Sequence, residues 1–135
     1  MKCVAVTPEK TVFDLEIEAV VLPLFDGEYG VEANHSPVVG RIGAGELRMT
    51  LKDKSIERWY VEGGFVEVAN NVVSLLTNCA YQFNLLNVDE ARDAFNAALA
   101  LPSNSPELAE IKNESVALAR ARLSAAEKAQ ALVRK

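Results

Sequence analysis

The sequence predicts a protein in two parts, a β-sandwich or barrel over residues 1–86 followed by an antiparallel two-helix hairpin over residues 87–135. In the first part, short stretches of alternating apolar and polar residues are separated by turn residues about every 8–12 residues, which is typical of an all-β domain. From residue 87 the apolar residues recur at helical spacing instead. From residue 107 to the end there is neither glycine nor proline, which favours one long second helix.

The first strands are predicted from alternation. Residues 2–6 form a short strand, and residues 11–22 give the clearest half-buried antiparallel strand of the chain. Pro23 is expected to limit the far end of this strand to an edge or an exit. The residues expected on its buried face are Phe13, Leu15, Ile17, Ala19 and Val21, and those on its wet face are Asp14, Glu16 and Glu18.

Residues 26–49 form a glycine-rich stretch that holds five glycines, one proline and the lone histidine, His35. Ordinary connections are about 4–6 residues long, so a connection of this length is expected to be functional or specially folded. Its end, from Glu46 to Leu51, alternates again with Leu47 and Met49 inward.

The remaining strands are bounded by turn signals. Residues 56–62 pair back after an Asp53-Lys54 turn, and residues 65–69 and 72–76 flank Asn70-Asn71, which suits a two-residue hairpin turn. The Gly63-Gly64 pair indicates a bulge or a close backbone approach.

Two helices are predicted from capping residues. Asn87 followed by Glu90 resembles a capping box, and Ser105-Pro106 provides an N-cap and a first helical residue. The first helix carries Val88, Ala91, Phe95, Ala98 and Leu99 at helical spacing. The second carries a thin apolar stripe of Leu108, Ile111, Leu118 and Leu123, which predicts either a weakly held arm that can detach or a permanently packed helix pair.

Charge, cysteines and hydropathy restrict the partners. A net charge of −5 argues against nucleic acid, although residues 106–135 carry +2, which indicates a different partner for that end or only a solvated face. Cys3 and Cys79 lack metal-ligand spacing, so we expect buried thiols in a reducing compartment. Without a signal peptide or an apolar run of about 20 residues, any contact with a membrane is expected to go through partners.

The sequence predicts neither a catalytic nor a metal site. His35 is the only histidine, Ser36 lacks a G-x-S-x-G elbow, and Glu16 with Glu18 fits a solvated strand face. The glycines at 40, 43 and 45 are followed by neither a lysine nor a helix start, so a phosphate loop is not expected.

Three blocks of sequence resemble the epsilon subunit of F-type ATP synthases. The first is the G-x-x-G-x-x-x-x-H-x-P pattern with its following strand, the second is VEGGFVEVANNVVSLLTNCA over residues 61–80, and the third is VDEAR over residues 88–92. The first block consists of Gly27, Gly30, His35, Pro37, Gly45, Glu46 and Arg48. The blocks occur in the order of the family and span essentially the whole chain.

The resemblance implies a non-catalytic subunit of the central stalk that binds the gamma subunit and the ring of c subunits in a proton-translocating complex. It places contacts with gamma or the ring at Asp26, Glu28, Tyr29, His35 and Pro37, although His35 also fits a hydrogen-bonded organiser of its loop. The second helix corresponds to a regulatory arm that inhibits ATP hydrolysis. Its Lys112, Arg120, Arg122, Lys128 and Arg134 are expected to meet acidic surfaces of the catalytic beta and alpha subunits.

The same resemblance raises the question of regulatory ATP. Some members of the family bind ATP at the hairpin, and here Asp89, Arg92, Arg120 and Arg122 are the matching residues. Asp93 stands where alanine is expected and is predicted to disfavour a polyphosphate, and an Asp89–Arg92 pair is also common on helix surfaces. No other cofactor is expected.

The location implied is the cytoplasmic face of a bacterial plasma membrane, and a plastid-encoded protein would look alike. The rival hypothesis is a generic β-sandwich interaction module with a helical oligomerisation tail.

Overall fold

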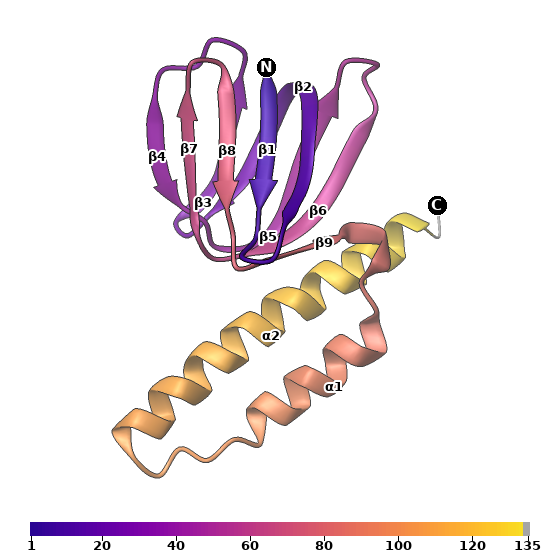
Figure 1. Ribbon diagram of the computed structural model, residues 1–135. Helices are drawn as coiled ribbons and strands as arrows, with labels where there is room; N and C mark the ends of the chain where they lie inside the picture. Colours follow the sequence, from indigo (N-terminus) through magenta and orange to yellow (C-terminus); the bar gives the residue numbers. More distant parts are fainter. Residues whose placement is uncertain (134–135) are drawn as a thin grey trace. The chain divides into compact units, whose positions relative to one another are not determined.

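A computed structural model describes residues 1–133 of the chain, which form two compact units (Figure 1). The first unit comprises residues 1–82 and the second begins at Phe83. The division falls a few residues before the predicted residue 87, because the short 3-10 helix η1 (Phe83–Leu85) contacts the second α-helix.

The strands of the first unit form two layers that share one strand. One layer has the order β4-β7-β8-β1-β2 and the other the order β3-β2-β5-β6-β9. The predicted β-sandwich, followed in the chain by two helices, is therefore confirmed. The strand bounds are β1 Lys2–Val6, β2 Thr11–Leu24, β3 Gly27–Glu32, β4 Val38–Arg41, β5 Ala44–Leu51, β6 Ile56–Glu62, β7 Phe65–Ala69, β8 Val72–Leu76 and β9 Cys79–Gln82.

Strand β2 passes from one layer to the other. Its first half pairs with β1, its second half pairs with β3 and β5, and the register with β5 shifts between Ile17 and Ala19. This irregularity reverses the alternation, since a shift of one residue turns every later side chain to the opposite face. The prediction that Ala19 and Val21 face the core is therefore wrong, and Val20 and Leu22 are the buried residues.

The prediction that Pro23 limits the far end of this strand to an edge or an exit agrees with the pairing, because β2 pairs with β5 only as far as Val21 and ends one residue after Pro23. Strand β2 runs on to Leu24, with Pro23 opposite Glu28 of β3. Proline lacks only the N–H group. Its carbonyl remains available, and Pro23 O accepts a hydrogen bond from Gly43 N at 2.8 Å.

The structure also corrects the prediction for the glycine-rich stretch. Residues 26–49 are not one long connection, because they contain β3, β4 and most of β5. Few apolar residues alternate here, and it is pairing with β2 and β7 that makes the segments strands. The stretch returns to the core at Ile42, which is 4% exposed and bridges to Leu24.

Two turn predictions are confirmed by the backbone. Asn70 and Asn71 adopt φ values of 53° and 63°, as a two-residue hairpin turn requires. Gly64 has φ +97°, and a Cβ there would overlap the carbonyl oxygen of Leu76. The Gly63-Gly64 pair therefore marks a close backbone approach that only glycine permits.

The core lies between the two layers. Its fully buried side chains include Ile17, Leu22, Leu47, Met49, Val61 and Leu75. Cys3 is buried as predicted, and burial raises the pKa of its thiol to about 12. Cys79 differs, because it is only half-buried and its S–H donates to the Glu62 carboxylate at 3.2 Å.

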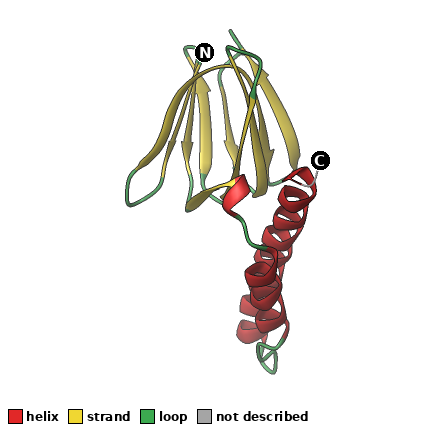
Figure 2. Cartoon of the chain, turned by 90° about the vertical axis from the view of Figure 1, so that its right-hand side faces the viewer, coloured by secondary structure: helices red, strands yellow, loops and turns green. Residues whose placement is uncertain are grey.

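The second unit contains α1 (Val88–Leu99) and α2 (Pro106–Val133), drawn as the two long helices in Figure 2. The predicted caps are confirmed: Asn87 Oδ1 accepts from Glu90 N at 3.0 Å, and Ser105 Oγ accepts from Leu108 N at 3.1 Å.

Three of the four residues of the apolar stripe predicted on α2 are exposed, and the fourth, Leu123, is half-buried. Leu108, Ile111 and Leu118 are 36%, 56% and 44% exposed, whereas the buried residues of the helices are alanines. Alanine side chains let two helix backbones approach closely, but each buries little apolar area. The buried residues are Ala91 and Ala98 of α1 and Ala125, Ala126 and Ala129 of α2.

Candidate functional site

The segment predicted to face the ring is the tip of the β2–β3 hairpin. The connection between these strands is the Phe25-Asp26 turn, and Gly27 follows it with φ +132°. Asp26 and Glu28 are exposed on this tip. The structure therefore places both acids on one short hairpin rather than on a long loop.

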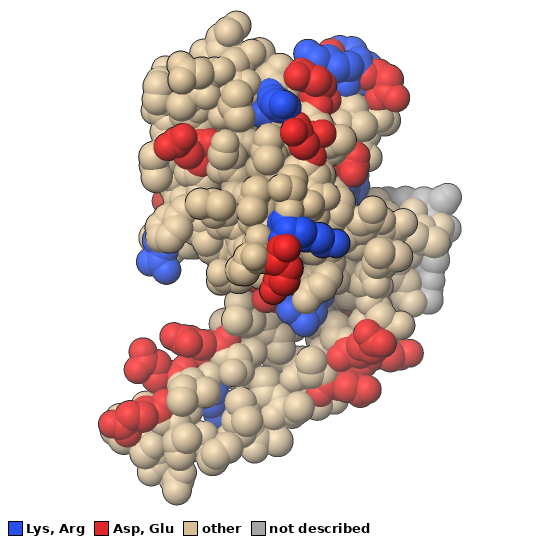
Figure 3. Space-filling model, in the orientation of Figure 1, with Lys and Arg blue, Asp and Glu red and all other residues tan. Residues whose placement is uncertain are grey.

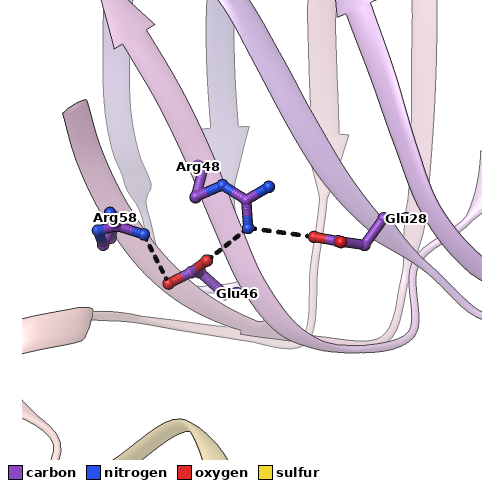
Figure 4. Close-up of polar contacts among 4 residues, drawn as sticks. All are labelled: Glu28, Glu46, Arg48 and Arg58. Carbon is purple, nitrogen blue, oxygen red and sulfur yellow. Dashed lines mark hydrogen bonds and ion pairs between the residues drawn. The ribbon is translucent and has the colours of Figure 1, made fainter. Parts of the chain in front are cut away.

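Glu28 belongs to a chain of four charged side chains contributed by strands β3, β5 and β6 (Figure 4). Arg48 Nη1 donates to Glu28 Oε2 at 3.1 Å and to Glu46 Oε1 at 2.7 Å, and Arg58 Nη1 donates to Glu46 Oε2 at 3.1 Å. The side chain of Glu46 is only 8% exposed beneath the two arginines. The hydrogen bond to Glu46 raises the pKa of Arg48 against the opposing effect of partial burial.

Sequence reasoning identified Glu28 but missed this network. The sequence signal for this network was the alternation in β5, which placed Glu46 and Arg48 together on its outer face. Their partners depend on register, since Arg48 lies directly opposite Arg58 of β6. Two arginines in that relation repel one another unless a carboxylate lies between them.

The structure brings Tyr29 and His35 together. Tyr29 Oη lies 3.0 Å from His35 Nε2, and His35 Nδ1 lies 2.6 Å from the carbonyl oxygen of Ser36. Because a carbonyl oxygen only accepts, Nδ1–H donates to Ser36 and Nε2 accepts from the tyrosine hydroxyl. Both ring nitrogens are thus used within the loop, which fits an organiser of this segment. Pro37 is exposed just before β4 and has no part in that pair.

Sequence reasoning also missed an apolar surface on the β4-β7-β8-β1 layer. Val39, Phe65 and Leu76 are 71%, 56% and 62% exposed, while Val66 and Leu75 beside them point into the core. Register aligns Phe65 with Leu76 and Leu76 with Val6. We call this surface the apolar face, and it consists of Val4, Val6, Val39, Phe65, Val72 and Leu76. Figure 3 shows broad uncharged areas on this side of the first unit, with acidic and basic side chains among them.

The four residues matched to an ATP site lie in the helical unit, where two of them, Arg92 and Arg120, contact other side chains of the helices. Arg92 Nη2 lies 4.0 Å from Glu127 Oε1, and the guanidinium of Arg120 lies 5.6 Å from the Phe95 ring centroid. Asp89 lies in the first turn of α1, and Arg122 is half-buried on α2. Asp93, the departure from the family pattern, is exposed on α1.

Within residues 1–133, no group of three or more His, Cys, Asp or Glu side chains is arranged to hold a metal ion. No described helix is both long and apolar enough to cross a membrane.

Comparison with known proteins gives the family. The model of the β-sandwich domain of the ATP synthase delta/epsilon chain matches residues 1–83, more than half of the sequence. The chain belongs to the ATP synthase delta/epsilon chain family. The resemblance drawn from the three sequence blocks is thereby confirmed.

The similarity to ATP synthase epsilon chains extends over both units. The epsilon chain of Rhodopirellula baltica is 45% identical over 125 residues, covering 93% of this chain and 97% of the relative. That of Nostoc punctiforme is 37% identical over 126 residues, covering 90% and 92%.

Two solved assemblies share the fold. A chain of the Euglena gracilis mitochondrial ATP synthase superposes with a TM-score of 0.81 at 19% identity, covering 91% of this chain and 79% of that one. A chain from the Tetrahymena thermophila mitochondrial ATP synthase central stalk and c-ring gives a TM-score of 0.66 at 15% identity, covering 93% and 96%.

Proposed function

We propose that this chain is the epsilon subunit of the central stalk in a proton-translocating F-type ATP synthase. In this role it is non-catalytic and couples the rotation of the gamma subunit to the ring of c subunits. The observation that carries the proposal is the 45% identity to an epsilon chain over 93% of the sequence, which spans both the sandwich and the helices.

The gamma subunit is assigned to the apolar face. Three of its side chains are more than half exposed although they are large and apolar. A surface of this kind on a soluble domain favours a protein partner, because its burial removes apolar area from water. Phe65 and Leu76 are neighbours on adjacent strands and form its centre.

The ring of c subunits is assigned to the β2–β3 tip and the loop behind it. Asp26 and Glu28 present carboxylates there, and the Tyr29–His35 hydrogen bond with Pro37 fixes the shape of the loop. A basic residue in a polar loop of the ring is a suitable partner for Glu28. In this arrangement the chain meets the membrane only through its partners and lies at the cytoplasmic face of a bacterial plasma membrane.

Helix α2 is proposed as the inhibitory arm. The buried side chains of α2 are alanines, so releasing the helix exposes little additional apolar surface of α2 itself. The basic side chains of the arm then bind acidic surfaces of the catalytic beta and alpha subunits. These residues are Lys112, Arg120, Arg122 and Lys128, and Arg134 lies outside the described residues.

Co-purification tests the central proposal. The full chain is expected to bind the gamma subunit, and Phe65→Ser with Leu76→Ser is expected to abolish binding. Lys52→Gln, an exposed change on β5–β6, is the matched control. A chain that self-associates and shows no affinity for gamma would support the rival oligomerising module instead.

A separate measurement tests the arm. Deleting residues from 106 onward is expected to raise ATP hydrolysis by the assembled complex, because the inhibitory helix is gone. Inhibition by the full-length chain is expected to weaken as salt screens the basic residues. Unchanged hydrolysis after the deletion contradicts the inhibitory role while leaving gamma binding intact.

A further inference from the structure

One corner of the apolar face carries a cation in an uncommon setting. Arg41, the last residue of β4, lies opposite Phe65 in the register with β7. Its guanidinium lies 5.4 Å from the ring centroid of Phe25, which follows β2 and is 69% exposed. The backbones of the two residues are joined as well, since Phe25 N–H donates to Arg41 O at 3.0 Å.

Arg41 has no carboxylate partner among residues 1–133. The ion pairs of the first unit use Arg48, Arg58, Lys2, Lys54 and the N-terminal amine. Glu67 is a diagonal neighbour of Arg41, because it lies opposite Val39 on β7, yet the two form no ion pair. The N–H groups of Arg41 therefore remain available to a partner.

The Phe25 ring prepares Arg41 for that use. A guanidinium held over an aromatic face is attracted by the ring and keeps its N–H fork in a limited set of orientations. A planar fork of this kind matches a carboxylate through two parallel hydrogen bonds. Less side-chain entropy is then lost when the carboxylate arrives.

The surroundings also select where the carboxylate approaches. A partner that covers the apolar face excludes water there, which strengthens the attraction between Arg41 and an acid. Glu67 repels a second carboxylate from the middle of the face. An acidic side chain of the partner is thus favoured beside Arg41 and Phe25 and disfavoured beside Glu67.

We propose that Arg41, held over Phe25, binds a carboxylate of the partner that covers the apolar face and so determines specificity at that interface. The inference rests on the proposed function, in which this partner is the gamma subunit. It adds the chemistry of one contact: the gamma surface presents apolar side chains and one acid opposite Arg41.

Binding of the full chain to the purified gamma subunit tests the inference at about 0.05 M and about 0.5 M salt. Arg41→Gln is expected to weaken binding about tenfold at low salt, which corresponds to one charge-assisted hydrogen-bonded pair. The difference from the unsubstituted chain shrinks at high salt. Arg41→Lys keeps the charge without the fork, so it recovers only part of the affinity.

Phe25→Leu separates orientation from charge. It is expected to weaken binding by a smaller factor and to have almost no further effect once Arg41 is Gln, because the ring acts through the guanidinium. Lys52→Gln is the charge-matched control and leaves affinity unchanged. Circular dichroism verifies that each variant folds.

The two failures are distinguishable. If Arg41→Gln binds gamma as tightly as the unsubstituted chain while Phe65→Ser loses binding, the specificity role of Arg41 is overturned and the proposed function stands. If the unsubstituted chain does not bind gamma at either salt concentration, the proposed function fails and the inference fails with it.

Discussion

Replacing Glu46 by Gln is expected to destabilise the sandwich more than any comparable change among its surface acids. The Glu46 side chain is 8% exposed and accepts hydrogen bonds from Arg48 at 2.7 Å and Arg58 at 3.1 Å. A glutamine of the same shape leaves the two cross-strand arginines without the negative charge between them.

The magnitude follows from the two contacts. Hydrogen bonds to charged groups contribute about 1.5–3 kcal/mol each, and the partial exposure of the arginines lets water replace part of that loss. We therefore expect a loss of about 2–3 kcal/mol in the free energy of unfolding. With a urea slope near 1 kcal/mol/M for a unit of this size, the midpoint falls by about 2–3 M.

Trp59 supplies the assay. It is the only tryptophan, is 8% exposed in the core of the first unit, and reports unfolding of that unit by fluorescence. Glu28→Gln is the matched control, because the Glu28 side chain bonds to the same Arg48 but is 63% exposed. A surface pair of that kind is worth about 0–1 kcal/mol. Equal effects of Glu46→Gln and Glu28→Gln would refute the role assigned to burial.

Three further predictions concern pH, backbone space and ATP. The unfolded Cys3 thiol ionises near its ordinary pKa of 9.0, whereas burial raises the pKa of the folded thiol to about 12. The contribution of the buried thiol to the free energy of unfolding is therefore complete below pH 9.0 and is lost as the pH rises toward about 12. The urea midpoints of the unsubstituted chain and of Cys3→Ala should converge over that pH range, and parallel pH profiles would contradict this. Gly64→Ala is expected to lower the free energy of unfolding by about 2 kcal/mol or more, because the added methyl group overlaps the Leu76 carbonyl at a residue with positive φ. Gly30→Ala is the control in the same urea titration, because a Cβ at Gly30 meets nothing within 4 Å. Isothermal titration of the full chain with millimolar ATP is expected to give no heat. Asp93→Ala is expected to increase any affinity for ATP, because this substitution removes a carboxylate near the polyphosphate. Strong binding of ATP by the unsubstituted chain would show that Asp93 does not oppose the ligand.

Local signals were sufficient for much of the fold. The bounds of β1, β6, β7 and β8 follow from alternation, the β7–β8 turn follows from Asn70-Asn71, and the helix starts follow from Asn87 and Ser105. Each of these depends on residues close together in the chain, where side-chain periodicity and capping chemistry act directly.

The remaining features depend on distant segments. Strands β3 and β4 exist because β2 and β7 pair with them, and their own glycine-rich sequence predicts a connection. The reversal in β2 needs the register with β5, and the Glu46 network needs the register with β6. On α2, the leucine stripe was the stronger hydrophobic signal, but close approach of the helices selected the alanine side.

The site was predictable to the same extent. Glu28, Tyr29 and His35 could be picked from sequence blocks, although their contacts with Arg48 and with one another required coordinates. The apolar face gave a faint signal, since Phe65 and Leu76 occupy positions where alternation calls for polar residues. The pair of Arg41 and Phe25 gave no sequence signal, because the two residues lie 16 positions apart in the chain.

The passage of β2 through both layers has a mechanical consequence. Its 14 residues span about 45 Å as one covalent strand from the β1 turn to the β2–β3 tip. In the proposed role, in which the ring of c subunits binds the tip, a torque applied there is carried by peptide bonds into the sheet that bears the apolar face. The hydrogen bonds on either side of β2 are then loaded together in shear instead of being peeled apart one after another, so the sandwich can transmit rotation with little elastic lag.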